Sequence, residues 1–285
     1  MSDAVHRASM GPALALIMLA PLLVLTSAGP LAAVPAPEIR SAAALVIDEG
    51  GTAVFAKHSG AVKPIASITK LMTAVVVLDS GADLDQTIAI TEADRDQLRH
   101  SRSRMRTNAA RLSRRDMLAI ALMSSENRAA SALGRTTFPG GTPAFVAAMN
   151  RKAQALGMYN THYADASGLD GANRSTAEDL VRLLQAASRY PLIREATTRG
   201  EMEVHPYADG GTLPYRNTNP LVRNADWQVE LSKTGYVNEA GHCLAMQAQI
   251  AGHRYWIVLL DSAGKLTPVG DSNRLRKWIE TDRRG

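Results

Sequence analysis

The chain has 285 residues and a formal net charge of +5, with 46% hydrophobic and 21% charged residues. This composition is ordinary for a globular protein, and the length allows one well-buried core or two closely joined subdomains. A single cysteine excludes an intramolecular disulfide, and the chain contains no repeats or low-complexity tracts.

Residues 1–36 are predicted to be a secretory signal peptide with a short linker, and residues 37–285 a single folded domain. Arg7 supplies a positive charge, Gly11–Ser27 is apolar, and small residues precede the proline-rich segment 34–37. An uncleaved membrane anchor is the alternative, but the apolar run is shorter than the roughly 20 residues that a span needs. We therefore expect an exported, periplasmic protein without a stable membrane anchor after cleavage.

The predicted elements of the domain form an α+β pattern. In chain order they are strands at 41–48 and 52–57, helices at 67–78, 112–123, 142–156 and 177–188, strands at 243–250 and 255–260, and a helix at about 271–281. Ser113 with Asp116, and Ser175 with Glu178, resemble capping boxes. Terminal strands that pair with an early hairpin indicate an antiparallel sheet with helices packed on it.

One segment of the chain is rich in arginine. Its members are Arg95, Arg99, Arg102, Arg104, Arg106, Arg111, Arg114 and Arg115. No aromatic residue in the segment could stack a base, and an exported protein meets little nucleic acid, so we expect no nucleic-acid partner. A basic rim that attracts carboxylates and a solvated face with internal ion pairs both stay open.

Three short motifs carry the chemistry. Ser67-Ile68-Thr69-Lys70 places a hydroxyl and an amine on one face of a helix, because residues three apart share a face. Ser125-Glu126-Asn127 and Lys233-Thr234-Gly235 follow at wide separation. A lone S-x-x-K carries little weight, since Ser67 could be a simple N-cap and the same pattern recurs at Ser262–Lys265. Cys243, in an alternating apolar run, is predicted to be a buried strand thiol rather than a nucleophile.

In motif order the chain resembles the low-molecular-mass penicillin-binding proteins, the bacterial D-alanyl-D-alanine carboxypeptidases and endopeptidases. The resemblance runs from about Glu38 to the C-terminus and includes Asp165–Leu169, which reads DASGL. Leu98–Arg106 and Leu259–Gly270 resemble the endopeptidase branch in particular. The resemblance implies a β-lactamase/DD-peptidase-like fold, in which the active site lies between an antiparallel sheet flanked by helices and an all-helical subdomain.

The same resemblance implies a serine DD-endopeptidase that hydrolyses D-alanyl–diamino acid cross-links in peptidoglycan through an acyl-enzyme. Ser67 would be the nucleophile and Lys70 its general base, with a pKa lowered by desolvation and by the charge of Lys233. Ser125 would relay a proton to the departing amine, and Asn127 would orient Lys70 and the substrate amide. Expected partners are peptidoglycan stem peptides, with β-lactam antibiotics as covalent inhibitors.

The third motif and the residue after it are expected to bind substrate. Lys233 and Thr234 would hold a substrate carboxylate, and Gly235 would leave room for the peptide backbone. The backbone N–H groups of Ser67 and Tyr236 would form the oxyanion hole. We expect no metal and no cofactor, because the histidines are scattered and a zinc peptidase would want closely spaced ligands such as H-E-x-x-H.

Three other functions stay open. A D-alanyl-D-alanine carboxypeptidase that trims pentapeptide stems uses the same catalytic residues and differs in the leaving group. The chain ends soon after Trp278-Ile279-Glu280, without the C-terminal domain and anchor helix of membrane-tethered carboxypeptidases, which favours the endopeptidase. A class A β-lactamase would need an E-x-x-L-N sequence, which is missing. A non-catalytic cell-wall binding protein of the same fold is disfavoured because all reactive positions are filled.

Overall fold

The centre of the domain is a five-stranded antiparallel sheet with strand order β2-β1-β11-β10-β9. The computed structural model describes Met1 and residues 35–282, so nearly all of the predicted signal segment lies outside the described residues. The five strands are β1 (Ala43–Asp48), β2 (Ala53–Lys57), β9 (Gln228–Val237), β10 (Gly241–Ile250) and β11 (His253–Ser262). As predicted, the early hairpin joins the late strands, through antiparallel pairing of β1 with β11.

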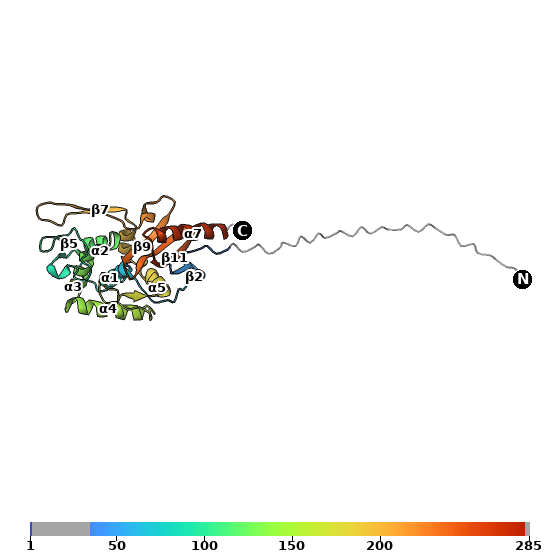
Figure 1. Cartoon of the computed structure of the whole chain (residues 1–285), viewed down its shortest axis with the longest axis horizontal. Coiled ribbons are helices and arrows are strands. Elements are labelled where there is room, and N and C mark those ends of the chain that lie inside the picture. Colours follow the sequence, from blue (N-terminus) through green and yellow to red (C-terminus); the bar gives the residue numbers. More distant parts are fainter. Residues whose placement is uncertain (2–34, 283–285) are drawn as a thin grey trace. The chain divides into compact units, whose positions relative to one another are not determined.

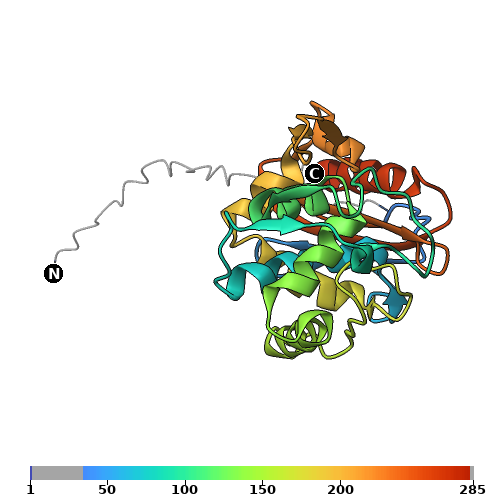
Figure 2. The same cartoon turned by 90° about the vertical axis from the view of Figure 1, so that its left-hand side faces the viewer.

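Helices cover both faces of this sheet (Figures 1 and 2). Neighbouring strand residues point to opposite faces, so Val46 is buried with the residues of α7 (Thr267–Asp282), whereas Leu45 is buried with those of α5 (Ala177–Ala187). In Figure 2, α7 (red) lies on one side of the strands and α4 and α5 on the other. The predicted arrangement of helices on an antiparallel sheet is therefore confirmed.

A helical part packs beside α5 on that second face. It contains α1 (Thr69–Asp79), α2 (Arg114–Met123), α3 (Asn127–Thr137), α4 (Gly141–Ala155) and α6 (Pro191–Thr198). Helix α1 is its centre, because every residue from Thr69 to Val77 is buried and α2, α3, α4 and α5 all contact it. Three short strand pairs complete the described fold: β3 (Lys63–Pro64) with β6 (Arg174–Ser175), β4 (Thr87–Ala89) with β5 (Arg111–Ser113), and β7 (Glu201–Val204) with β8 (Leu213–Arg216).

The two predicted capping boxes have different outcomes. Ser113 caps α2 as predicted, since its hydroxyl accepts a hydrogen bond from the Asp116 N–H at 3.0 Å. The box assigned to Ser175 is wrong by one residue. Thr176 caps α5 instead, because the Ser175 hydroxyl is already bonded to that of Thr161 at 2.7 Å.

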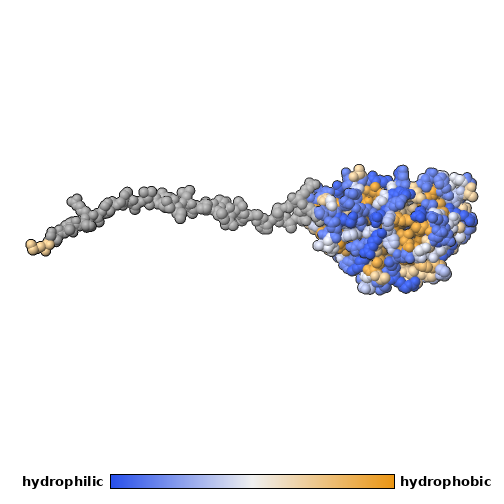
Figure 3. All heavy atoms as spheres, turned by 180° about the vertical axis from the view of Figure 1, so that it is seen from behind, coloured by the Kyte–Doolittle hydropathy of each residue, from blue (hydrophilic) through white to orange (hydrophobic). Residues whose placement is uncertain are grey.

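The surface of the domain is mixed. On the face shown in Figure 3, hydrophilic side chains surround separate apolar areas. In the part of the chain that the structure describes, no helix is both long and apolar enough to cross a bilayer.

Candidate active site

A cleft of about 850 Å³ brings the three motifs together. Six of the eight predicted site residues line it: Ser67, Ser125, Asn127, Thr234, Gly235 and Tyr236. The other two, Lys70 and Lys233, are buried with 1% exposure each. Lys70 contacts the lining residues Ser67 and Asn127, and Lys233 directly precedes Thr234 on β9. The structure therefore brings all eight residues together at one place.

Ser67 lies in a 3₁₀ turn, η1 (Ala66–Ile68), that leads into α1, and not in the first turn of the predicted helix. Ala66 has a positive φ of 46°, and two glycines pack closely on the turn. A Cβ on Gly168 would stand 2.0 Å from the Ala66 carbonyl oxygen, and one on Gly235 would stand 3.0 Å from the Ser67 nitrogen. The space that a Cβ of Gly235 would occupy is therefore filled by this turn. Gly235 also lines the cleft, and the expected room for substrate backbone there stays a prediction.

The amine of Lys70 has three oxygen neighbours. Its Nζ lies 2.7 Å from Ser67 Oγ, 2.8 Å from Asn127 Oδ1 and 2.6 Å from the carbonyl oxygen of Ser167. The N-cap of α1 is Ile68, which makes no side-chain cap bond. The alternative interpretation of Ser67 as an N-cap is therefore wrong, and its hydroxyl lies beside the amine.

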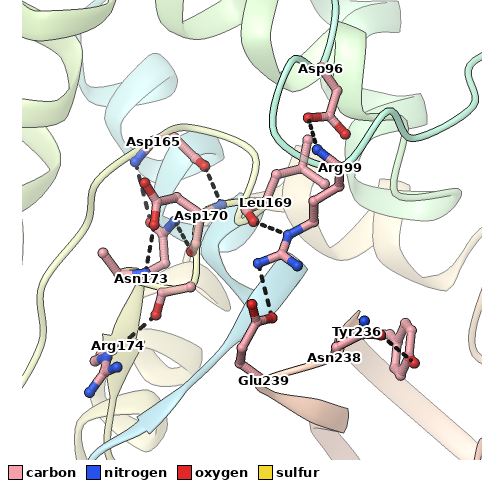
Figure 4. Close-up of polar contacts among 12 residues, drawn as sticks. Asp96, Arg99, Asp165, Leu169, Asp170, Asn173, Arg174, Tyr236, Asn238 and Glu239 are labelled. Carbon is pink, nitrogen blue, oxygen red and sulfur yellow. Dashed lines mark hydrogen bonds and ion pairs between the residues drawn. The ribbon is translucent and has the colours of Figure 1, made fainter.

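The third neighbour of Lys70, the Ser167 carbonyl oxygen, lies in the loop Asp165–Leu169. The sequence predicted no role for this loop. Asp165 accepts hydrogen bonds from the N–H groups of Ser167, at 2.6 Å, and Asp170, at 2.7 Å, as well as from that of Gly168. Part of this network is drawn in Figure 4. The carboxylate thereby fixes the Ser167 carbonyl that faces Lys70. The sequence signal for this role is the D-x-S-G pattern, in which an aspartate stands two residues before a serine and a glycine follows that serine.

Burial governs the protonation of both lysines. It lowers the pKa of Lys70 to about 7, although the carboxylates of Asp165 and Glu126 act in the opposite direction. Burial also lowers the pKa of Lys233 well below its usual value, and a charge on Lys70 lowers it further. The predicted desolvation of Lys70 is confirmed by its burial. The charge of Lys233, the second predicted cause, is not among the causes of the lowered pKa of Lys70, and the charge of Lys70 instead lowers the pKa of Lys233.

Ser125 and Asn127 lie where α2 passes into α3. Ser125 has a φ of 63°, a conformation that turns the chain sharply, and its side chain lines the cleft. Asn127 is the first residue of α3, and its amide donates to Ser101 Oγ at 3.1 Å. Ser101 was not predicted as a site residue, but it belongs to the endopeptidase-like stretch Leu98–Arg106.

On the sheet side, β9 presents the third motif. Lys233 Nζ donates to the carbonyl oxygen of Thr234 at 2.9 Å, and the Thr234 hydroxyl lies 2.6 Å from that of Thr218, a residue that sequence reasoning missed. The Tyr236 ring stacks on His242 with centroids 4.3 Å apart. The second endopeptidase-like stretch meets the cleft here, with four residues in its lining: Lys265, Leu266, Pro268 and Val269.

The two competing nucleophiles have structural roles. Ser262 is fully buried at the end of β11, and its hydroxyl lies 2.8 Å from that of Ser41. Cys243 is buried in β10, and burial raises the pKa of its thiol to about 12. Its prediction as a strand thiol is confirmed.

Several arginines of the basic segment pair with carboxylates of this chain. Arg95 lies 3.1 Å from Glu92, and Arg115 lies 3.6 Å from Asp85. Arg114 is buried, and its guanidinium donates to backbone and side-chain oxygens. This arrangement favours a solvated face with internal ion pairs.

Comparison with known proteins gives a consistent result. A family model described as D-alanyl-D-alanine carboxypeptidase, Peptidase S11, matches residues 31–264. A D-alanyl-D-alanine endopeptidase of Pseudomonas aeruginosa is 49% identical over 245 residues, which covers 86% of this chain and 78% of that protein. Another, of Escherichia coli, is 46% identical over 247 residues and covers 86% and 79%.

Solved structures show the same similarity. The DD-transpeptidase of Streptomyces K15 superposes with a TM-score of 0.79 at 26% identity, over 86% of this chain and 98% of that one. Penicillin-binding protein D2 of Listeria monocytogenes, in its ampicillin-bound form, gives a TM-score of 0.71 at 29% identity, over 86% and 98%.

Proposed function

Because this chain belongs to the Peptidase S11 family and is a serine D-Ala-D-Ala peptidase, we propose that it is an exported endopeptidase that hydrolyses D-alanyl–diamino acid cross-links in periplasmic peptidoglycan. The observation that carries this proposal is the buried amine of Lys70 at 2.7 Å from the Ser67 hydroxyl, within a cleft bordered by β9. β-Lactams would acylate the same serine.

The three neighbours of Lys70 support its proposed role as the general base. A neutral amine has two N–H groups and one lone pair. The oxygens of Asn127 and Ser167 can only accept, so they take the two N–H groups and leave the lone pair for the proton of Ser67. A pKa of about 7 keeps a large share of Lys70 neutral near pH 7, which suits a general base.

The reaction then proceeds in two steps. Lys70 takes the Ser67 proton while the Ser67 oxygen attacks the D-alanyl carbonyl carbon, and the resulting oxyanion accepts hydrogen bonds from the N–H groups of Ser67 and Tyr236. The C–N bond breaks as Ser125 passes the proton from Lys70 to the departing amine. Water hydrolyses the ester and restores the serine.

Substrate binding falls to the sheet side of the cleft. A carboxylate near the Thr234–Thr218 hydroxyl pair would bind Lys233 and raise its lowered pKa, so that the charged form persists when substrate is bound. Exposed Tyr236 and Leu266 border the same cleft and offer apolar surface to a peptide.

The choice of endopeptidase over carboxypeptidase rests on two supports. The relatives at 49% and 46% identity are named D-alanyl-D-alanine endopeptidases. The stretches Leu98–Arg106 and Leu259–Gly270 both reach the site, one through Ser101 and the other through the cleft lining. Export to the periplasm is supported by the predicted signal peptide at 1–36.

Changing Ser67 to Ala removes the nucleophile, so both labelling by a fluorescent penicillin and cleavage of peptidoglycan fragments are expected to stop. Ser262→Ala is the matched control, because Ser262 opens the second S-x-x-K of the chain. That variant should lose about 1 kcal/mol of stability with its hydrogen bond to Ser41 and keep its labelling. Persistent labelling of Ser67→Ala would refute the assignment.

The leaving group is tested by giving the purified protein cross-linked muropeptide dimers and pentapeptide monomers side by side. We expect faster cleavage of the dimers. Trimming of pentapeptides without dimer cleavage would instead identify a carboxypeptidase, and penicillin labelling without cleavage of either substrate would identify a cell-wall binding protein.

A further inference from the structure

A second cavity, of about 430 Å³, lies next to the active cleft. Leu169 lines the cleft, and the next residue, Asp170, lines the second cavity. The charged side chains around this cavity are two cations and two anions: Arg99, Arg174, Asp170 and Glu239. The proposed mechanism uses none of them.

Arg99 and Glu239 form an ion pair across this cavity (Figure 4). Arg99 Nη2 lies 3.0 Å from Glu239 Oε2, and Arg99 Nε donates to the carbonyl oxygen of Leu169 at 2.5 Å. Asp96 fixes the loop that carries the guanidinium, by accepting from the Arg99 N–H at 3.0 Å. Arg99 is therefore held in place at three points, and two of its five N–H groups are accounted for by Leu169 and Glu239.

The pair is open to a ligand. The side chains of Arg99 and Glu239 are 25% and 55% exposed. Gly171 lies over them without covering them, because a Cβ there would stand 3.8 Å from Arg99 Nη2 and 3.9 Å from Glu239 Cδ. A larger side chain at this position would close the space above the pair.

The sheet directs a bound peptide towards the pair. β9 is the outer strand of the sheet, so an extended peptide can lie along its free edge. Glu239 follows Tyr236 by three residues, roughly 10 Å of chain. If the substrate carboxylate binds near Thr234 and the scissile D-alanine lies at Ser67 and Tyr236, the diamino acid that precedes this D-alanine would lie beside the later end of β9, from which its long side chain could reach the cavity.

We propose that this cavity binds the free side-chain end of that diamino acid, with Arg99 taking its carboxylate and Glu239 its ammonium group. The balance of two cations and two anions suits a ligand end that carries both charges. A side chain that ends in an ammonium group alone would leave Arg99 without a partner from the ligand. The inference rests on the proposed function, because it assumes a stem peptide acylating Ser67.

The test compares two synthetic stems that differ in the residue before the scissile D-alanine, meso-diaminopimelic acid in one and lysine in the other. We expect the protein to prefer the first by about tenfold in kcat/KM. Glu239→Gln should slow the cleavage of both stems and keep the preference, because both stems carry the side-chain ammonium group. Arg99→Gln should abolish the preference, because only the first stem carries the carboxylate that Arg99 would bind. Gly171→Leu, which keeps both charges but covers them, should abolish it as well.

Arg95→Gln is the matched control, because Arg95 forms a similar exposed pair with Glu92 at 3.1 Å in the same part of the chain. This variant should keep the preference. Penicillin lacks the diamino acid, so its acylation rate should be unchanged in Arg99→Gln and in Gly171→Leu. If penicillin acylation is normal, this inference alone would be overturned by the lack of a preference in the unmodified protein or by a preference that survives Arg99→Gln. Loss of all acylation in the unmodified protein would count against the proposed function instead.

Discussion

At the scale of single residues, the proposed mechanism depends on an uncharged Lys70, whose pKa is lowered to about 7 by burial. The amine is buried among three oxygens, and burial outweighs the opposing carboxylates of Asp165 and Glu126. The same burial acts on Lys233, which has to be protonated to hold a carboxylate. Under the proposed mechanism, the two lysines therefore need opposite protonation states.

This opposition predicts a bell-shaped pH dependence of kcat/KM for peptide cleavage. On the acidic side the rate should fall about tenfold per pH unit below the Lys70 pKa of about 7, since the base becomes protonated. On the alkaline side it should fall as Lys233 loses its proton. A rate that stays flat between about pH 5 and 7 would show that Lys70 is not the base.

At the scale of elements, the catalytic turn is clamped between a loop and a strand. Gly168 and Gly235 let the segment 165–169 and β9 approach η1 from two sides, closer than any side chain would allow. The position of Ser67 relative to Lys70 therefore depends on the backbone of elements that are distant in sequence.

Gly168→Ala is expected to force this clamp apart. The new Cβ would lie 2.0 Å from the Ala66 carbonyl oxygen, so we expect a loss of about 3 kcal/mol of stability and about a hundredfold slower penicillin acylation. Gly210→Ala is the control, because Gly210 has the same φ of 80° but no atom within 4 Å of a Cβ. It should lose about 1 kcal/mol and acylate normally. Equal effects in both variants would show that backbone conformation alone matters at Gly168.

The sequence predicted the side chains of the proposed catalytic site better than the backbone elements that position these side chains. Ser67, Lys70 and Asn127 were found because their chemistry requires particular residue types at particular spacings. Helix α3 was missed, although Asn127 of the second motif is its first residue, because the sharp turn at Ser125 lets it begin only a few residues after α2 ends. The role of Ser167 was missed because a backbone carbonyl leaves no mark on residue type.

At the scale of the whole domain, the two ends of the described chain are joined by one carboxylate. Asp271, fully buried in α7, accepts from the Arg40 N–H at 3.0 Å, the Ser41 N–H at 2.7 Å and the Ser41 hydroxyl at 2.6 Å. Burial raises the pKa of Asp271, but the bonds from Ser41, Arg40 and Arg274 outweigh burial and leave the pKa below its usual value.

Asp271→Asn should therefore cost about 2 to 4 kcal/mol in urea unfolding at neutral pH. Because the folded pKa lies below the unfolded one, the carboxylate stabilises the fold above about pH 4 and loses this effect as the pH falls through the folded pKa. The difference between the two proteins should therefore shrink in acid. Asp209→Asn, at an exposed pair 3.9 Å from Arg106, should change stability little at either pH; a difference that did not shrink for Asp271 would contradict its assigned ionisation.

The strand order has a consequence for how the protein matures. β11 lies between β1 and β10, so the sheet is complete only after nearly the whole domain has been synthesised. Pairing β1 with β11 also costs conformational entropy, because a long stretch of chain separates the two strands. Ser67, from the early part of the domain, lies against β9, from its late part, so a chain that stops before β9 lacks one wall of the cleft. We therefore expect reactivity with penicillin to appear only after β9 has been made and has packed against η1.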